Sequence, residues 1–132
     1  MIRISTESGL RHSITIGEHQ LLTDVPESFG GTDSGPEPHD LFDAALGACK
    51  ALTLMLYAKQ KGLPLDSLDV RVARDDSQER QGLYRLHVEL DLHGALDDSQ
   101  RQQLLRIADK CPIHKLMTST EVQVDTRLSD NV

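Results

Sequence analysis

Two cysteines, Cys49 and Cys111, are the residues of this sequence with the most distinctive chemistry. They stand 62 positions apart (111 − 49), which excludes the CxxC dithiol of thioredoxin-like proteins. In a reducing compartment a cysteine pair is more often apolar filler, a metal ligand set or a redox catalyst than a permanent disulfide. Only the fold can bring these two side chains together.

The second cysteine stands directly before a proline, and two interpretations follow. Pro112 suits the first position of a short helix, whose free N–H groups and positive dipole end would favour a Cys111 thiolate. Lys110, His114 and Lys115 add positive charge nearby. Alternatively, Cys111 is a small buried apolar residue placed where the preceding helix ends.

The first cysteine lies in a run of small residues, LGACKAL at positions 46–52. Glycine inside a helix costs about 1 kcal/mol relative to alanine, so Gly47 is expected to have a packing or functional reason. Small residues on both sides would let another helix or a substrate approach Cys49 closely. A well-packed core cysteine is the equally simple alternative.

The elements that must position these thiols can be predicted from periodicity. Residues 2–4 read as a strand, residues 11–22 as a hairpin turning at Gly17-Glu18, and residues 32–38 as an irregular loop. A helix is expected from Pro38 to about Lys61, ended by Gly62 and Pro64. Its apolar stripe, expected to be the buried face, comprises Phe42, Ala45, Leu46, Cys49, Leu52, Thr53 and Leu56.

Two alternating segments, 68–74 and 85–93, predict an antiparallel hairpin. A second helix, capped by Asp97, Asp98 or Ser99, should end near Cys111 because Pro112 disfavours helical geometry before it. Alternation over 121–128 predicts a final strand. The order indicates an α+β fold in a single domain, residues 1–132.

Composition narrows the function. The chain has 132 residues, 14 basic against 21 acidic side chains, and a formal charge of −7. This acidity argues against nucleic acid and against an anionic membrane surface as partners. No apolar run approaches a membrane span and no export signal is apparent, so we expect a soluble, cytoplasmic protein.

Three segments, 35–54 (GPEPHDLFDAALGACKALTL), 57–65 (YAKQKGLPL) and 109–115 (DKCPIHK), resemble the OsmC/Ohr superfamily of osmotically induced and organic-hydroperoxide-resistance proteins. The resemblance implies antiparallel sheets around a long central helix that carries the first cysteine. It also implies an intertwined homodimer with active sites at the subunit interface.

The chemistry implied by this resemblance is that of a thiol peroxidase. Cys49 would attack an organic hydroperoxide and become a sulfenic acid, and Cys111 would condense with it to a disulfide. An external dithiol would then reduce the pair. We expect no cofactor.

Burial disfavours a thiolate, so the reactive cysteine needs a cation nearby. In the superfamily this cation is an arginine from the N-terminal strands, which is held in place by a glutamate near the start of the long helix. Here the corresponding position, ten residues before the first cysteine, is His39, with Asp40 and Glu37 as the carboxylates that could replace the glutamate. Arg11 is the expected cation and Arg3 the reserve.

Two other functions use the same residues. Cys111 and His114 together with Cys49 and His39 would make a zinc-compatible ligand set. A non-enzymatic protein could instead bind a small hydrophobic ligand and sense oxidation through the two cysteines, each chain reacting once.

Overall fold

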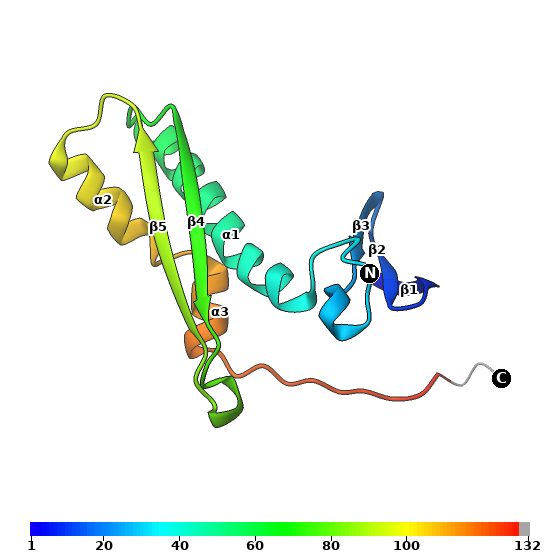
Figure 1. Ribbon diagram of the computed structural model, residues 1–132. Coiled ribbons are helices and arrows are strands. Elements are labelled where there is room, and N and C mark those ends of the chain that lie inside the picture. Colours follow the sequence, from blue (N-terminus) through cyan, green and yellow to red (C-terminus); the bar gives the residue numbers. More distant parts are fainter. Residues whose placement is uncertain (130–132) are drawn as a thin grey trace. The chain divides into compact units, whose positions relative to one another are not determined.

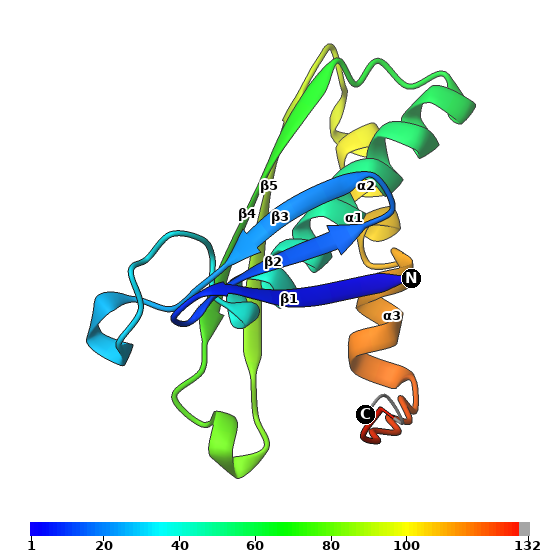
Figure 2. The same ribbon diagram turned by 90° about the vertical axis from the view of Figure 1, so that its right-hand side faces the viewer.

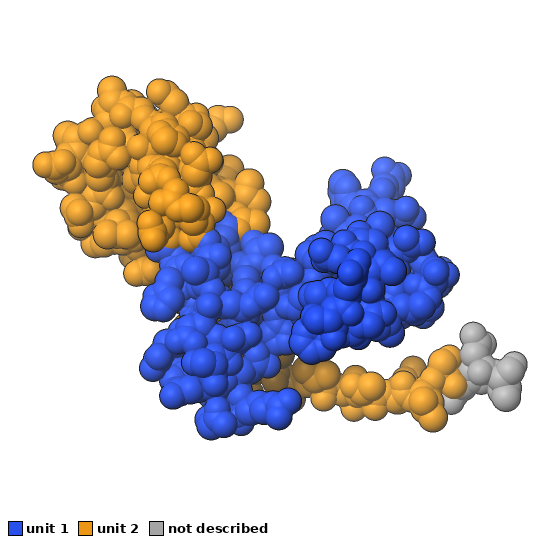
Figure 3. Space-filling model, in the orientation of Figure 1, with its two compact units in different colours: residues 1–47, 72–88 blue, residues 48–71, 89–132 orange. Residues whose placement is uncertain are grey.

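The computed structural model describes residues 1–129 as two compact units (Figure 3). The first comprises Met1–Gly47 and Val72–Val88, and the second comprises Ala48–Arg71 and Glu89–Val132. The long helix α1 (Pro38–Lys61) and the β4–β5 hairpin contribute residues to both units. The expectation of a single domain over the whole chain stays a prediction.

The first unit contains a three-stranded antiparallel sheet of β1 (Ile2–Ser8), β2 (Arg11–Ile16) and β3 (His19–Thr23), in that order (Figure 2). Ile14 pairs with Ile4 on one side and with Leu21 on the other, and it is the buried residue of the sheet. Gly17 turns the chain with a φ of 60°. The predicted hairpin is confirmed.

The loop between the sheet and the long helix is organised by one carboxylate. Asp24, 3% exposed, accepts hydrogen bonds from the backbone N–H groups of Val25, Thr32 and Ser34 and from the hydroxyls of Thr32 and Ser34. These bonds lower the pKa of Asp24, the Ser34 hydroxyl contributing most. A short 3-10 turn, η1 (Glu27–Phe29), lies within the loop.

Helix α1 has the predicted bounds. It begins at Pro38, carries Asp40 in its first turn and Lys59 and Lys61 in its last, which suits the helix dipole. Its 24 residues span about 36 Å.

By length and composition alone, α1 could cross a membrane, since an 18-residue window has a mean hydropathy of 1.4. The core helix of a soluble protein meets the same criterion, however, and α1 carries two buried charged residues, Asp43 and Lys50.

The hairpin of β4 (Ser67–Asp75) and β5 (Arg85–His93), joined through η2 (Glu79–Gln81), confirms the predicted pair of strands. In the second unit, α2 (Asp98–Ala108) begins at the N-cap Asp97 in a reciprocal capping box with Gln100. Helix α3 (Pro112–Ser119) follows directly, as Figure 1 shows.

The core of the second unit lies where α1 and α2 pack against the hairpin (Figure 1). Its buried members are Leu54, Ala58, Leu65, Leu104 and Ala108. Partly buried leucines of both strands, Leu68, Leu90 and Leu92, extend it. The aliphatic core matches a composition with four aromatic residues.

The expected buried face of α1 is wrong. Phe42, Leu52 and Leu56 are 47%, 65% and 59% exposed, and of the predicted stripe only Leu46 is buried. The face that α1 buries is instead marked by Asp43, Leu46, Gly47, Lys50, Leu54 and Ala58. The charged side chains lie on the buried face because they have polar partners there, described below.

The expected final strand over residues 121–128 is also wrong. Residues 120–129 form no helix or strand, and Val122, Val124 and Leu128 are 61%, 83% and 92% exposed. A strand is defined by hydrogen bonds to a neighbouring strand, and none of the described residues pairs with this segment.

Candidate active site

Cys49 lies in the middle of α1 and is half-buried. Its Sγ is 4.0 Å from the hydroxyl oxygen of Thr53, one helical turn further along. The exposed apolar side chain of Leu52 is three positions away on the same helix. Cys49 is a free thiol, with the polar side chain of Thr53 and the apolar side chain of Leu52 nearby on the same helix.

Cys111 is the N-cap residue of α3, with Pro112 at the first helical position as predicted. It is fully buried, and its Sγ accepts a hydrogen bond from the backbone N–H of His114 at 3.4 Å. Burial raises the pKa of the Cys111 thiol above its ordinary value, even though the helix N–H lowers it. The predicted helix start is confirmed, whereas the predicted thiolate-favouring environment is outweighed by burial.

The fold brings the two cysteines together. The Cys49 side chain raises the pKa of the Cys111 thiol further. Both are free thiols. Cys49 and Cys111 are 62 positions apart in the sequence, and both belong to the second unit.

A buried lysine lies beside this pair. The Lys50 side chain is 4% exposed, and its Nζ donates to the carbonyl oxygen of Ala108 at 2.7 Å. Nζ is also 2.9 Å from Nδ1 of His114 and 3.6 Å from the Asp109 carboxylate. The positive charge of Lys50 lowers the pKa of Cys111, opposing burial.

The predicted supporting residues Glu37, His39 and Asp40 lie together in the first unit, but around an arginine that was not predicted. Arg74, from β4, donates to Asp40 at 2.9 Å and lies 3.4 Å from Glu37. His39 bridges Glu37 at 3.1 Å and Glu79 at 2.9 Å.

At the centre of that cluster is Asp43, whose side chain is 11% exposed. It accepts hydrogen bonds from Arg74 at 2.7 Å and from the Tyr84 hydroxyl at 2.6 Å. Burial, followed by the bond to Asp43, raises the pKa of Tyr84 to about 12. The hydrogen bonds that Arg74 donates, first to Asp43 and then to Asp40, raise the pKa of Arg74.

Arg11 and Arg3, the two candidate cations, lie on β2 and β1 of the first unit. Arg11 forms an ion pair with Glu7 at 3.5 Å and none with the predicted carboxylates. The cysteines belong to the second unit, so the role of either arginine toward Cys49 stays a prediction.

Sequence reasoning missed Lys50, Arg74, Asp43 and Tyr84. A usable signal was present for two of them. Asp43 and Lys50 interrupt an otherwise apolar helix and are seven residues apart, which is two helical turns. Charged residues repeated on one face of an apolar helix indicate buried polar partners.

The proposed zinc set gains no support. Within residues 1–129, no group of three or more His, Cys, Asp and Glu side chains is arranged to hold a metal ion.

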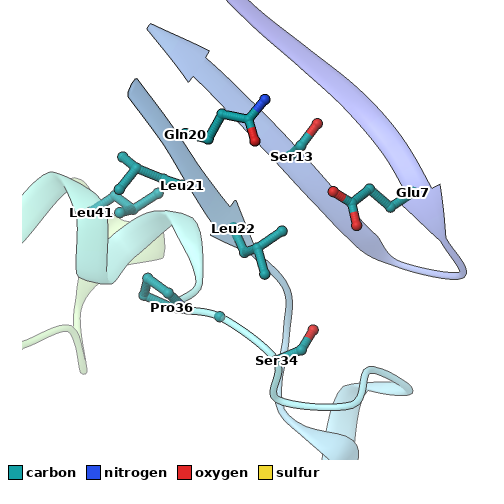
Figure 4. Close-up of a pocket in the computed structure, with 9 residues that line it drawn as sticks. Glu7, Ser13, Gln20, Leu21, Leu22, Ser34, Pro36 and Leu41 are labelled. Carbon is teal, nitrogen blue, oxygen red and sulfur yellow. The ribbon is translucent and has the colours of Figure 1, made fainter. Parts of the chain in front are cut away.

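The first unit carries an open cavity of about 560 Å³ beside β2 and β3 (Figure 4). Its lining contains no cysteine or histidine, and its one carboxylate, Glu7, is the ion-pair partner of Arg11. The lining residues are Glu7, Ser13, Gln20, Leu21, Leu22, Ser34, Gly35, Pro36 and Leu41.

Comparison with solved structures supports the fold. An OsmC-like protein from Mycoplasma pneumoniae is 17% identical, with a TM-score of 0.75 over 90% of this chain and 86% of that one. An organic hydroperoxide resistance protein, OsmC, from Legionella pneumophila is 22% identical, with a TM-score of 0.61 over 90% of each chain. The organic hydroperoxide resistance protein OhrB of Bacillus subtilis is 25% identical, with a TM-score of 0.59 over 90% of this chain and 91% of that one.

No curated protein sequence matches the chain. The family model described as OsmC-like protein matches residues 31–127, a range that contains both cysteines, helix α1 and the β4–β5 hairpin. The α+β architecture, with antiparallel sheets and a long helix carrying the first cysteine, agrees with that match. The chain therefore belongs to the OsmC-like protein family.

Proposed function

We propose that this protein is a cysteine-based peroxidase that reduces organic hydroperoxides. The observation that carries the proposal is the meeting of two free thiols, Cys49 on α1 and Cys111 at the start of α3, from distant parts of the sequence. Two thiols that come together can supply the two electrons that a hydroperoxide must receive to be reduced to an alcohol and water.

The reaction has two balanced steps. The Cys49 thiolate attacks the distal oxygen of ROOH, the O–O bond breaks, and the alkoxide takes up a proton to leave as ROH. The Cys111 thiolate then attacks the resulting Cys49 sulfenic acid. An S–S bond forms, the S–O bond breaks, and the hydroxide leaves as water after protonation. An external dithiol reduces the disulfide by exchange.

The substrate class follows from the surroundings of Cys49. Leu52 and Leu56, 65% and 59% exposed, lie one and two turns beyond it on α1. A hydrocarbon tail placed against them would gain about 25 cal/mol per Å² of buried apolar area, which hydrogen peroxide cannot. The Legionella and Bacillus relatives are named for organic hydroperoxide resistance.

The active form is proposed to be a homodimer. Large apolar side chains of the α1 stripe are exposed, namely Phe42, Leu52 and Leu56, and a second copy of the chain would cover them. The alternating residues 121–128, unpaired among the described strands, offer a further segment for a partner subunit to hold. A second copy of the chain would cover the stripe of α1 and would provide a partner for residues 121–128.

Proteins of this family are soluble, and the cytoplasm is the proposed compartment because both cysteines are free thiols. Neither nucleic acid nor membrane is proposed as a partner, in keeping with the charge of −7.

The proposal is tested by measuring how many hydroperoxide molecules each chain consumes. The reduced protein is mixed with excess cumene hydroperoxide and dithiothreitol, and hydroperoxide loss is followed per chain, with Cys49→Ser as the matched control. A peroxidase consumes many equivalents and Cys49→Ser consumes none. Consumption that stops at one equivalent per chain would instead identify a redox sensor, and consumption by Cys49→Ser would remove Cys49 from the reaction.

A further inference from the structure

Lys50 is the most deeply buried cation among the described residues that has polar partners on two other elements. Nζ donates to the Ala108 carbonyl at 2.7 Å, at the C-terminal end of α2, where carbonyl groups lack helical partners. It also contacts Nδ1 of His114, in the first turn of α3, at 2.9 Å. One side chain of α1 therefore joins the end of α2 to the start of α3.

The contact with His114 pairs a donor with an acceptor. Lys50 Nζ and His114 Nδ1 are 2.9 Å apart, and an ammonium group has only donors, so Nδ1 accepts the hydrogen bond from the positively charged Lys50. The exposed Asp109 carboxylate at 3.6 Å and the helix end offset the cost of burying this charge.

This anchored charge is connected to the second cysteine through His114. The backbone N–H of His114, whose ring Lys50 holds, donates to Cys111 Sγ at 3.4 Å. The groups that act electrostatically on Cys111 are this N–H, the Lys50 ammonium and the Cys49 thiol. Lys110 and Lys115, the cations adjacent in sequence, are exposed to solvent.

We propose that Lys50 is the positioning residue of the resolving step: its ammonium, anchored on Ala108 and His114, stabilises the Cys111 thiolate and holds the first turn of α3 against it. This role rests on the proposed function, because a resolving step exists only if the protein is a peroxidase. The Cys111 thiol gives up its proton, its sulfur bonds to the oxidised Cys49 sulfur, and hydroxide departs as water. Without the buried cation, the pKa of Cys111 would rise further, so that the thiolate would be scarcer and the Cys49 sulfenic acid would persist longer.

The first test needs no hydroperoxide. In a Cys49→Ser background Cys111 is the only thiol, and its thiolate is titrated by ultraviolet absorbance. Replacing Lys50 by methionine, which keeps the length and removes the charge, is expected to lower the thiolate fraction about tenfold at a pH below the transition. Lys50→Arg restores most of it, and Lys115→Met, which removes an exposed charge nearby, leaves the titration unchanged. A titration unmoved by Lys50→Met overturns the proposal.

If Lys50→Met fails to fold, as judged by far-ultraviolet circular dichroism, Lys50→Gln takes its place, because the amide keeps a donor without the charge. A thiolate fraction in Lys50→Gln equal to that of Lys50→Arg overturns the proposal as well.

The second test follows the resolving step in the protein with both cysteines. After one equivalent of cumene hydroperoxide, disulfide formation is timed by acid quench at several pH values. Lys50→Met should form sulfenic acid at the original rate and disulfide about tenfold more slowly, with the pH profile displaced upward. Unchanged disulfide formation contradicts the role of Lys50. A protein that forms no sulfenic acid at all contradicts the peroxidase proposal and leaves the titration of Cys111 to stand on its own.

Discussion

The guanidinium of Arg74 donates a hydrogen bond of 2.7 Å to the carboxylate of Asp43, whose side chain is 11% exposed. This pair connects strand β4 to the first half of α1 within the first unit. The carboxylates Glu37 and Asp40 surround the same guanidinium. The acidic residues before Cys49 therefore hold an arginine, but it is an arginine of β4 and not the expected one of β2.

Removing the buried carboxylate should destabilise the fold. Asp43→Ala leaves the Tyr84 hydroxyl without its acceptor and removes the most buried of the acceptors of Arg74, which is expected to cost about 2 kcal/mol in the free energy of unfolding. Urea denaturation of the variant and of the unmodified protein measures this difference in the free energy of unfolding. Asp40→Ala is the matched control, because that side chain is 46% exposed and its loss should cost much less. Equal effects of the two variants would contradict a central role for Asp43.

His39 should make stability depend on pH. Its hydrogen bonds to Glu79 and Glu37 raise its pKa above the unfolded value of about 6.5. The stabilisation is fully present below that unfolded value and is lost as pH rises through the raised one. The free energy of unfolding should therefore fall as pH rises above about 6.5 and through the raised pKa of His39, less so in high salt because His39 is partly exposed. His39→Gln should flatten this part of the curve, and an undiminished slope in that variant would assign it to another group.

Arg11 remains the predicted activating cation for Cys49. Arg11→Ala should slow the reaction of Cys49 with cumene hydroperoxide at least about tenfold, measured by stopped-flow or by competition. Arg3→Ala, on the neighbouring strand, is the matched control and should retain the rate. If Arg3→Ala is slow and Arg11→Ala is not, the activating residue is Arg3.

Cys111→Ser should stop the cycle halfway. With no second thiol to condense with, Cys49 oxidised by one equivalent of hydroperoxide should stay a sulfenic acid long enough to react with dimedone. Mass spectrometry locates the adduct on the peptide containing Cys49. Absence of the adduct under conditions where hydroperoxide is consumed would remove Cys111 from the resolving role.

The exposed stripe of α1 should hold the dimer together. Leu52→Asp places a charge in that stripe and should shift the protein to monomer in analytical ultracentrifugation. Leu105→Asp, at a leucine of α2 that is 49% exposed, is the control and should leave the association state unchanged. A protein that is monomeric before any substitution contradicts the proposed assembly.

Most of the secondary structure followed from local rules. The bounds of α1 match the positions of Pro38 and Gly62, and α2 begins at Asp98 because the side chain of the preceding Asp97 caps the helix. Strands with clear alternation, such as residues 85–93, appeared as predicted. These features depend on neighbours in sequence, which periodicity and capping residues report.

The errors concern burial and long-range pairing. The apolar stripe of α1 does not identify the buried face, because Asp43 and Lys50 are buried with partners on β4, α2 and α3 that are far away in sequence. Alternation over residues 121–128 cannot show whether a partner strand is present. For the same reason the sequence identified both cysteines as candidates but not the lysine beside them.

The proposed peroxidase reaction requires that the two thiols react as a pair. The reduced protein is treated with one equivalent of cumene hydroperoxide, and free thiols and intact mass are measured under denaturing conditions. We predict the loss of both thiols and a decrease in mass of two hydrogen atoms per chain, corresponding to a Cys49–Cys111 disulfide. Two intact thiols with unchanged mass would contradict the proposed peroxidase.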